Sequence, residues 1–508
     1  MKKIFYIATI ALFGLASCSK DVLNPVPSNA VSDSQIFSSV SSAQTALNGG
    51  IMYIGEYRTF TLQTIMAEVM GEDALMTSGN YGIDTYNWNV YSYTYSQVPE
   101  DDPWWFGYSN YIWLYDYKGV DAANNIIAYV TDMPDEAGKE NLLGQAYGLR
   151  AYMFLRLARL FAPAYSINSE SPCIILRTEP ADGASEHQPR ASLKATYEQI
   201  LKDFEYARQH CSASNNAYFT PKACALFMAR AYLDMGDYAN AKKFAEEAAS
   251  NTFDGSNLMS QAEWQDGFRD PNVEWLMYYN FNQTTSNYYA SLPSFYYLAK
   301  AAYNVDETGK ANPADIDYLD TDEQDNYFEE PLYGYSTVRW TKRFRESFED
   351  TDCRKLFPFY FNADDGWFTS KFSHRPDGAG GLYIGDADFP LARIAEAYLI
   401  KAECEARTGG NAKAVLNVLQ TARGATPTDG SLENILYERR KELYGEGLRL
   451  GDIKRTHQAL DRSKDPEHWA TVKQLPADSP RFMLPIPQNE MLYNKALTAK
   501  DQNEYWRK

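Results

Sequence analysis

The chain has 508 residues, and its 67 Asp and Glu residues outnumber its 48 Lys and Arg residues, giving a formal net charge of −19. This acidic balance argues against a nucleic-acid-binding protein, because phosphate recognition requires a basic surface. The chain is also rich in aromatic residues, with 39 Tyr, 25 Phe and 10 Trp. A large core accounts for many of them, but Tyr has a polar tip and is typical of half-exposed binding surfaces.

The N-terminus has the pattern of a bacterial lipoprotein signal peptide. Met1-Lys2-Lys3 is positively charged, residues 4–15 are apolar but too few to span a bilayer, and Leu15-Ala16-Ser17-Cys18 forms a lipobox. Cleavage leaves Cys18 to carry acyl chains, and more than one chain anchors a protein stably. The alternative is a plain secretory signal with a chance cysteine. We expect residues 1–17 to be a signal peptide, 18–30 a lipidated stalk and 31–508 a single domain.

An aromatic strip lies within an irregular region of residues 53–113. Tyr86 and Trp88 belong to a near period-two run of aromatic residues, and a turn at 101–103 then presents Trp104 and Trp105. A sugar ring stacks its apolar face on Trp or Tyr, while nearby carboxylates and amides hydrogen-bond its hydroxyl rim. The strip therefore predicts a carbohydrate-binding platform. The alternative is core packing, which we favour for Trp105 and Trp113, because both also fit the start of a helix.

Helical patterns dominate the regions that follow. Residues 142–161 form an amphipathic pattern that Pro163 ends. In residues 223–249, Tyr232, Gly236 and Ala241, Ala245 and Ala248 occupy the positions of a tetratricopeptide helix pair, in which glycine permits a tight turn and small residues allow close packing. Residues 391–422 repeat this pattern, with the turn at Gly410-Asn411. The sequence predicts a mainly α fold, in which a tetratricopeptide-like helix-pair scaffold supports long irregular, aromatic-rich loop regions that carry the ligand site.

A second irregular region spans residues 253–389. Its aromatic cluster at 287–297 contains Pro and Ser, which favour a loop, so Tyr288, Tyr289 and Tyr296 are candidates to complete the platform. Trp340 and Trp367 are weaker candidates. The acidic run 306–330 favours a solvated loop, because it lacks the Gly-centred spacing of an EF-hand. A structural calcium site there is left open.

Residues 432–455 have the pattern of a helix, a glycine turn and a second helix. Arg439 takes a position on the apolar face of the first helix, alongside Ile435 and Leu443. A buried arginine needs a partner, because an unpaired buried charge is strongly unfavourable. We expect Glu442 or Glu446 to pair with Arg439. Gly445 and Gly447 are expected to end the first helix.

Signatures of catalysis are missing from the sequence. It contains no G-x-S-x-G, Walker A or H-E-x-x-H motif, and its five histidines lack metal-ligand spacing. Glu72-Asp73 is a carboxylate pair of the kind that glycosidases use, but 67 acidic residues make chance pairs common. The five cysteines after Cys18 are scattered, which is typical of buried small apolar residues. We expect no catalytic residue, no metal site and no cofactor.

Several ordered motifs resemble the SusD/RagB family of outer-membrane nutrient-binding lipoproteins. The run 435–455, ILYERRKELYGEGLRLGDIKR, is similar to the family's C-terminal hallmark, and residues 388–405 are similar to the helix that precedes it. Asp352 and Arg354 match its Asp-x-Arg, and residues 484–490 match its Ile-Pro segment. The chain end, residues 502–505, resembles the family's closing motif, with Glu504 in place of Pro-Gly.

The resemblance implies a lipid-anchored protein of the outer membrane. We favour exposure at the cell surface over the alternative, a periplasmic location, because surface-exposed family members often carry acidic residues after the cysteine and Asp21 fits this pattern, although Lys20 does not. Such a protein captures an oligosaccharide and delivers it to a SusC-like TonB-dependent transporter without catalysis. Two alternatives are a peptide-binding RagB-like uptake lipoprotein and a lipid-anchored glycoside hydrolase. The resemblance also places Asp73 where family members make a polar ligand contact. The predicted ligand-binding residues are Asp73, Tyr86, Trp88, Trp104, Trp105, Tyr288, Tyr289 and Tyr296, with Cys18 as the lipidation site.

Overall fold

The computed structural model contains fifteen α-helices and six short strands in the part of the chain that it describes. The described residues are 36–57, 59–76, 108–181, 187–282, 285–287, 290–296, 337–355, 369, 371–373, 375, 387–466, 468 and 472–507. The helices are α4 (Val40–Gly55), α5 (Phe60–Val69), α7 (Tyr108–Thr131), α8 (Lys139–Phe161), α9 (Leu193–His210), α10 (Pro221–Met235), α11 (Tyr238–Ala248), α12 (Gln261–Gln265), α13 (Leu292–Tyr296), α15 (Lys342–Glu346), α16 (Ile394–Thr408), α17 (Ala412–Ala422), α18 (Leu432–Glu442), α19 (Arg449–Arg455) and α20 (Gln488–Tyr493). The predicted mainly α fold is confirmed.

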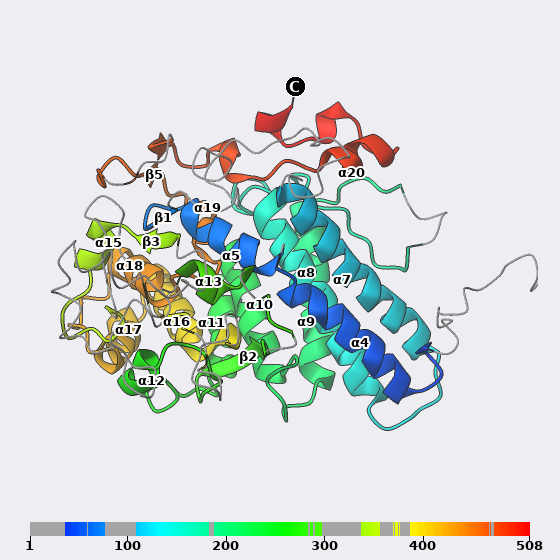
Figure 1. Cartoon of the computed structure of the whole chain (residues 1–508), viewed down its shortest axis with the longest axis horizontal. Coiled ribbons are helices and arrows are strands. Elements are labelled where there is room, and N and C mark those ends of the chain that lie inside the picture. The colour runs from blue at the N-terminus through cyan, green and yellow to red at the C-terminus, as the bar shows by residue number, and fades with distance from the viewer. Residues whose placement is uncertain are drawn as a thin grey trace, which may run out of the picture.

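The long helices form a stack in which each packs against the next. Successive contacts join α4, α7, α8, α9, α10, α11 and α16 in that order, and α16 then packs against both α17 and α18. Figure 1 shows this row crossing the molecule from the blue and cyan helices to the yellow and orange ones. Such stacking buries a continuous core, because no single helix pair can cover its own apolar face. The predicted helix-pair scaffold is present.

The predicted helix pair in residues 223–249 consists of α10 and α11. Thr220 caps α10 by accepting a hydrogen bond from the Ala223 amide, and Gly236 ends the helix with a φ of 76°. A left-handed residue at this position favours glycine, which has no Cβ. The rings of Tyr232 and Phe244 stack across the pair at a centroid distance of 5.5 Å. In the second predicted pair, α16 and α17, Gly409 is the left-handed residue that ends the first helix, one position before the predicted Gly410-Asn411 turn.

The strands form three two-stranded antiparallel ribbons. Strand β1 (Ala74–Met76) pairs with β3 (Val338–Trp340), β2 (Trp275–Tyr279) with β4 (Phe389–Arg393), and β5 (Leu460–Asp461) with β6 (Gln474–Leu475). The first two ribbons join segments that are more than 100 residues apart, whereas β5 and β6 are neighbours in the chain. β1 follows α5 and β4 runs directly into α16, so these two ribbons connect the irregular regions of the sequence to the helices.

The C-terminal segment crosses one end of the stack, at the top of Figure 1. It contains the 3-10 helices η4 (Pro480–Phe482), η5 (Ala499–Asp501) and η6 (Glu504–Trp506). Gln502 forms a two-way hydrogen bond with the backbone of Ile486, and Asn503 donates to the Phe161 carbonyl oxygen at the end of α8. The closing motif and the Ile-Pro motif therefore meet and fasten the chain end to the scaffold.

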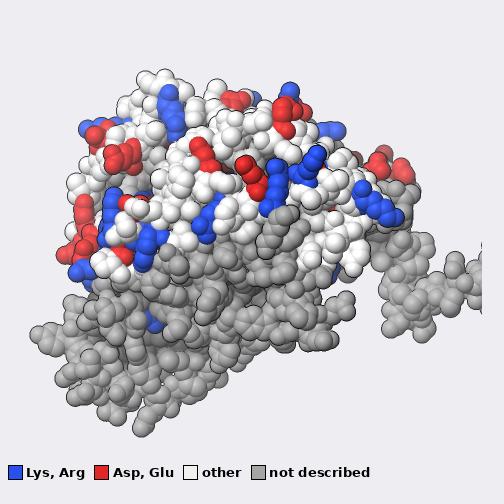
Figure 2. Space-filling model, turned by 90° about the horizontal axis from the view of Figure 1, so that it is seen from above, with Lys and Arg blue, Asp and Glu red and all other residues white. Residues whose placement is uncertain are grey.

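The face of the molecule at the top of Figure 1 carries charges of both signs. Figure 2 shows Lys and Arg interspersed with Asp and Glu over the described part of this face.

The cysteines of the described residues are buried free thiols, as the scattered spacing predicted. They are Cys173, Cys211, Cys224, Cys353 and Cys404. Within the described part of the chain, no helix combines the length and the apolar character needed to cross a membrane.

Candidate functional site

Most predicted ligand residues lie outside the described part of the chain. Asp73 and Tyr296 are described, and the candidate site is built from these two residues and from the elements that flank the aromatic segments. The predicted residues outside the described ranges are Tyr86, Trp88, Trp104, Trp105, Tyr288 and Tyr289, together with the predicted lipidation site Cys18.

The β1–β3 ribbon brings together the ends of the two aromatic regions. Met76, the last described residue before residues 77–107, is paired with Val338, which follows residues 297–336 closely. Tyr296 ends α13 on the other side of the second gap, and its ring contacts that of Tyr444 at 5.9 Å. Tyr444 in turn contacts Trp340 of β3 at 5.6 Å. The chain therefore enters residues 77–107 and leaves residues 297–336 at one ribbon, where the paired residues Met76 and Val338 are 262 positions apart.

Asp73 is held by an arginine of the C-terminal hallmark. Its carboxylate accepts hydrogen bonds from Arg440 through Nε at 2.8 Å and through Nη2. The residue is 5% exposed, and its backbone oxygen accepts a hydrogen bond from the Thr341 amide. Both carboxylate oxygens are thus engaged within the protein, at the point where α5 passes into β1.

Two buried glutamates near Asp73 have opposite protonation. Burial raises the pKa of Glu68 to about 8, so that this carboxyl is neutral at pH 7. Burial also acts on Glu72, but the guanidinium groups of Arg449 and Arg440 outweigh it and lower the pKa of Glu72 to about 2. Of these two carboxyls, Glu72, which accepts a hydrogen bond from Arg449, is the one that keeps its charge at pH 7.

Tyr296 and Trp340 are core residues in the structure. Tyr296 has 0% exposure and Trp340 has 2% exposure. The Trp340 ring stacks on Phe348 at a centroid distance of 5.0 Å. Packing beneath the ribbon accounts for both side chains, whereas the sequence pattern placed them among the surface candidates. Ile112 and Trp113 are buried in α7, in agreement with the core interpretation of Trp113.

A buried network of ion pairs joins the family motifs. Arg393 of β4 donates to Glu274 and Glu442 at 2.6 Å each, and Arg423 donates to Glu442 at 2.8 Å. Arg354, from the Asp-x-Arg motif, donates to Glu442 at 3.0 Å. All of these groups are buried, and the three guanidinium groups hold the pKa of Glu442 well below its ordinary value despite its burial.

The prediction for the partners of Arg439 is wrong. Arg439 is buried as expected, but it pairs with Asp452 of α19 at 2.8 Å and with Glu396 of α16 at 2.9 Å. Glu442 and Glu446 are occupied by the arginines of the buried network and by Lys371. Arg439 therefore pairs with carboxylates of neighbouring helices, because Glu442 and Glu446 are already bound by cations of the buried network.

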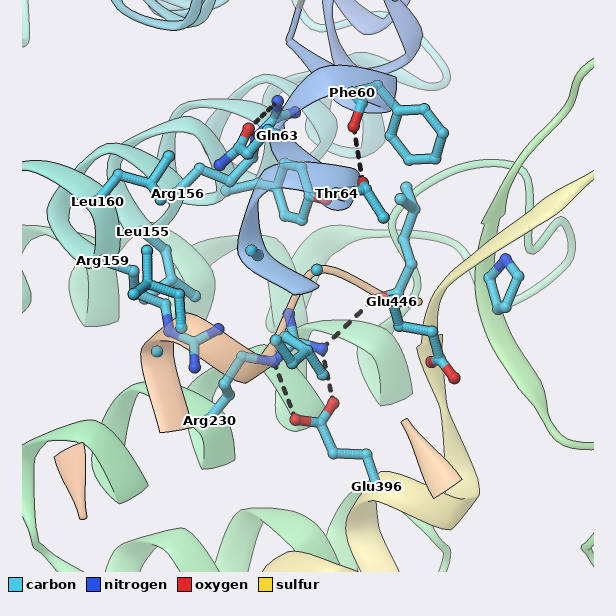
Figure 3. Close-up of a pocket in the computed structure, with 18 of the residues that line it drawn as sticks. Phe60, Gln63, Thr64, Leu155, Arg156, Arg159, Leu160, Arg230, Glu396 and Glu446 are labelled. Carbon is cyan, nitrogen blue, oxygen red and sulfur yellow. Dashed lines mark hydrogen bonds and ion pairs between the residues drawn. The ribbon is translucent and has the colours of Figure 1, made fainter. Parts of the chain in front are cut away.

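A polar cleft lies between α5, α8, α10 and the turn before α19. Its enclosed volume is about 80 Å³, room for a few water molecules. Figure 3 shows Arg156 bonded to Gln63 and Arg230 bonded to Glu396 along its walls. Arg159 pairs with Asp234 at 3.1 Å. These cations pair with other side chains of the protein, and the cleft lies at the junction between the helical scaffold and the C-terminal hallmark.

Gly451 in the wall of this cleft is a residue that sequence reasoning missed. A Cβ atom there would lie 2.3 Å from Nη2 of Arg159, so the glycine makes room for the guanidinium. An isolated glycine inside a helix is the signal that was available, because such a glycine usually has a packing reason. In the residues that the structure describes, no group of three or more His, Cys, Asp or Glu side chains is arranged to hold a metal ion.

Comparisons with known proteins agree with the motifs. A model described as SusD family matches residues 358–506, and a model described as starch-binding associating with outer membrane matches residues 32–233. No curated protein matches the chain significantly.

Solved structures share the fold over nearly the whole chain. A SusD-like carbohydrate binding protein from Bacteroides vulgatus is 25% identical, with a TM-score of 0.71, over 91% of this chain and 98% of that one. A putative sugar binding protein from the same organism is 23% identical, with a TM-score of 0.72 and the same coverage. A laminarin binding SusD-like protein is 18% identical, with a TM-score of 0.67, over 92% of this chain and 99% of that one. In its ordered motifs, its helix-pair scaffold and these matches, the chain is similar to the SusD/RagB family over most of its length.

Proposed function

We propose that the protein is a cell-surface glycan-binding lipoprotein that captures an oligosaccharide and delivers it to a SusC-like TonB-dependent transporter. The observation that carries this proposal is the match, over 91% of the chain, to a solved SusD-like carbohydrate binding protein. The family model that matches the N-terminal half describes starch binding and association with the outer membrane. The solved structures described as a carbohydrate binding protein and as a surface glycan-binding protein support the expectation of binding without catalysis.

The proposed ligand surface is aromatic. Trp88 and Trp104 are its main stacking residues, supported by Tyr86, Trp105, Tyr288 and Tyr289 from the two regions that flank the β1–β3 ribbon. Stacking on aromatic rings suits sugars, because their C–H faces are apolar while their rims are polar. The region that supplies Tyr86, Trp88, Trp104 and Trp105 follows β1 in the chain, and β1 pairs with β3. Tyr288 and Tyr289 come shortly before α13, whose Tyr296 ring contacts Tyr444, which in turn contacts Trp340 of β3.

Binding of purified mature protein to a glycan array, with a peptide pull-down in parallel, tests this function. We expect saturable binding to an oligosaccharide and no release of product. Trp88→Ala and Trp104→Ala should each weaken binding by about 1–3 kcal/mol, the range for base stacking on aromatic side chains elsewhere. Tyr493→Ala removes an aromatic ring that is 73% exposed on α20 and is the matched control. Selective peptide binding would instead favour the RagB-like alternative.

The membrane anchor is tested separately. We propose residues 1–17 as signal peptide, 18–30 as stalk and 31–508 as one domain, with acyl chains on Cys18. Cys18→Ala should move the protein from the membrane fraction to the soluble fraction, and protease treatment of intact cells should degrade the wild-type protein. Membrane retention of the variant would contradict the anchor, and full protease protection would contradict surface exposure. Co-purification with a TonB-dependent transporter checks the proposed partner.

A further inference from the structure

Three arginines from the C-terminal part of the chain hold the short segment between α5 and β1. Arg440 binds Asp73, and its Nη1 lies 3.2 Å from Glu72. Arg449 donates to Glu72 at 2.6 Å. Arg462 donates to the backbone oxygens of Val69 at 2.7 Å and Gly71 at 2.9 Å. We call Arg440, Arg449 and Arg462 the arginine clamp.

The clamp operates in a buried environment. Glu72 is 7% exposed and Arg449 is 5% exposed, while Arg462 is fully buried. Ion pairs that are shielded from water are weakened little by salt and are more rigid than surface pairs. Gly71 adds close packing, because a Cβ atom there would lie 2.8 Å from Cγ of Arg449. Residues 69–73 are therefore held by ion pairs of Glu72 and Asp73, by hydrogen bonds from Arg462 to the backbone, and by close packing of Gly71 against Arg449.

The clamp compensates for a weak ribbon. Strand β1 has three residues, and a two-stranded ribbon is marginally stable by itself. The clamped segment continues into the ribbon through the hydrogen bond from the Thr341 amide to the Asp73 backbone oxygen, 2.9 Å long. Fixing residues 69–73 therefore fixes where β1 and β3 lie relative to the helical scaffold.

We propose that Arg440 and Arg449 are positioning residues for ligand capture, which act by fixing the β1–β3 ribbon and do not touch the ligand. This inference rests on the proposed function. It also gives Asp73 a new role, because its carboxylate acts through Arg440 and not as a direct ligand contact. Binding residues that are held in place in advance lose less entropy when a ligand binds, so a loosened ribbon lowers affinity.

The main test is a double-mutant cycle on glycan affinity with Asp73→Asn, Arg440→Gln and the double variant. If both residues act through their ion pair, each single change weakens binding by roughly tenfold, and the double variant is no weaker than either single variant. If Asp73 contacts the ligand directly, Asp73→Asn weakens binding while Arg440→Gln leaves it unchanged, which would overturn the proposal.

A matched control separates positioning from general stability. Arg208 of α9 also pairs with two carboxylates, Glu205 at 2.6 Å and Glu247 at 2.7 Å, and its side chain is 24% exposed against 17% for Arg440. Arg208→Gln should leave glycan affinity unchanged. Hydrogen exchange of residues 69–76 gives a local readout, and we expect it to accelerate in Arg440→Gln but not in Arg208→Gln. Equal exchange in the two variants would contradict the clamp.

Outcomes for this inference and for the proposed function are distinct. Failure of the wild-type protein to bind any glycan would refute the proposed function and, with it, the role of the clamp in capture. Wild-type binding with unchanged affinity in Arg440→Gln would refute only the positioning role. If Arg440→Gln does not fold, Arg440→Lys keeps the charge but loses the two-point geometry, and it should weaken binding by an intermediate factor.

Discussion

Two helix–turn–helix units in this protein are held together in different ways. In α10–α11, Gly236 forms the turn, and Ala241, Ala245 and Ala248 are fully buried against neighbouring helices. In α18–α19, Gly445 and Gly447 form the turn, with φ values of 77° and 75°. There the contacts are buried ion pairs, such as Arg439 with Asp452.

The difference shows that two helices joined by a glycine turn can be held together either by close packing of alanines or by buried ion pairs. Close packing of small residues depends on shape and is insensitive to pH, whereas a network of buried charges depends on every partner being present and ionised. The side chains of the charged unit also pair with α16, β4 and the segment before β1. The ion pairs of α18–α19 therefore connect this unit to elements that are distant in the sequence.

Acid should have the largest effect, and it should separate the two units. The guanidinium groups of Arg423, Arg393 and Arg354, none of them in α10–α11, outweigh the burial of Glu442 and hold its pKa well below the ordinary 4.5. The stability that Glu442 contributes is therefore complete above pH 4.5 and is lost as pH falls through the lowered folded-state pKa. Hydrogen exchange, corrected for intrinsic rates, should show residues 432–455 losing protection at pH 3 before residues 238–248. Simultaneous loss would contradict the distinction.

Among single substitutions in the two units, Glu442→Gln should be the most damaging. It removes the charge shared by Arg393, Arg423 and Arg354 and should destabilise the protein by about 3–5 kcal/mol. Urea unfolding measures this loss. Glu433→Gln on the exposed side of the same helix should change stability by less than about 0.5 kcal/mol. Similar losses in both variants would mean that the network adds little.

The two turn glycines should differ in sensitivity. Gly236→Ala forces a left-handed alanine with no nearby atom under 3.9 Å, and should cost about 1–2 kcal/mol. Gly445→Ala has the same backbone strain and places Cβ 2.3 Å from the Phe372 ring, adding about 1–3 kcal/mol. Thermal unfolding of the two variants compares them, and equal midpoints would show that Phe372 moves aside freely.

Overpacking should be felt in the alanine-based unit. Ala245→Leu inserts a large side chain into a fully buried position of α11 and should cost about 1–3 kcal/mol. Ala239→Leu, at an exposed position of the same helix, is the control and should be close to neutral. Urea midpoints measure both, and a neutral Ala245→Leu would mean that the helices separate without loss.

Local features of the fold were predictable because their signals lie close together in the sequence. The helix over residues 142–161, the glycine that ends α10 and the break at Gly445 and Gly447 all follow from periodicity and backbone preference within a few turns. The candidate site was less predictable. Trp340 and Tyr296 look like surface aromatics in sequence, yet they pack under the ribbon, because burial depends on which distant segments cover a residue.

The sequence by itself determined the family motifs, the helix pairs and the need for a partner at Arg439, since each depends on residue type and short spacing. Only the tertiary structure decided which partners those charges take. Asp73 and Arg440 form an ion pair although they are 367 residues apart in the sequence. Arg439 pairs with Asp452 and Glu396 and not with Glu442, which is nearer to it in the sequence. An ion pair forms wherever folding brings opposite charges together out of water, and sequence spacing does not limit that distance.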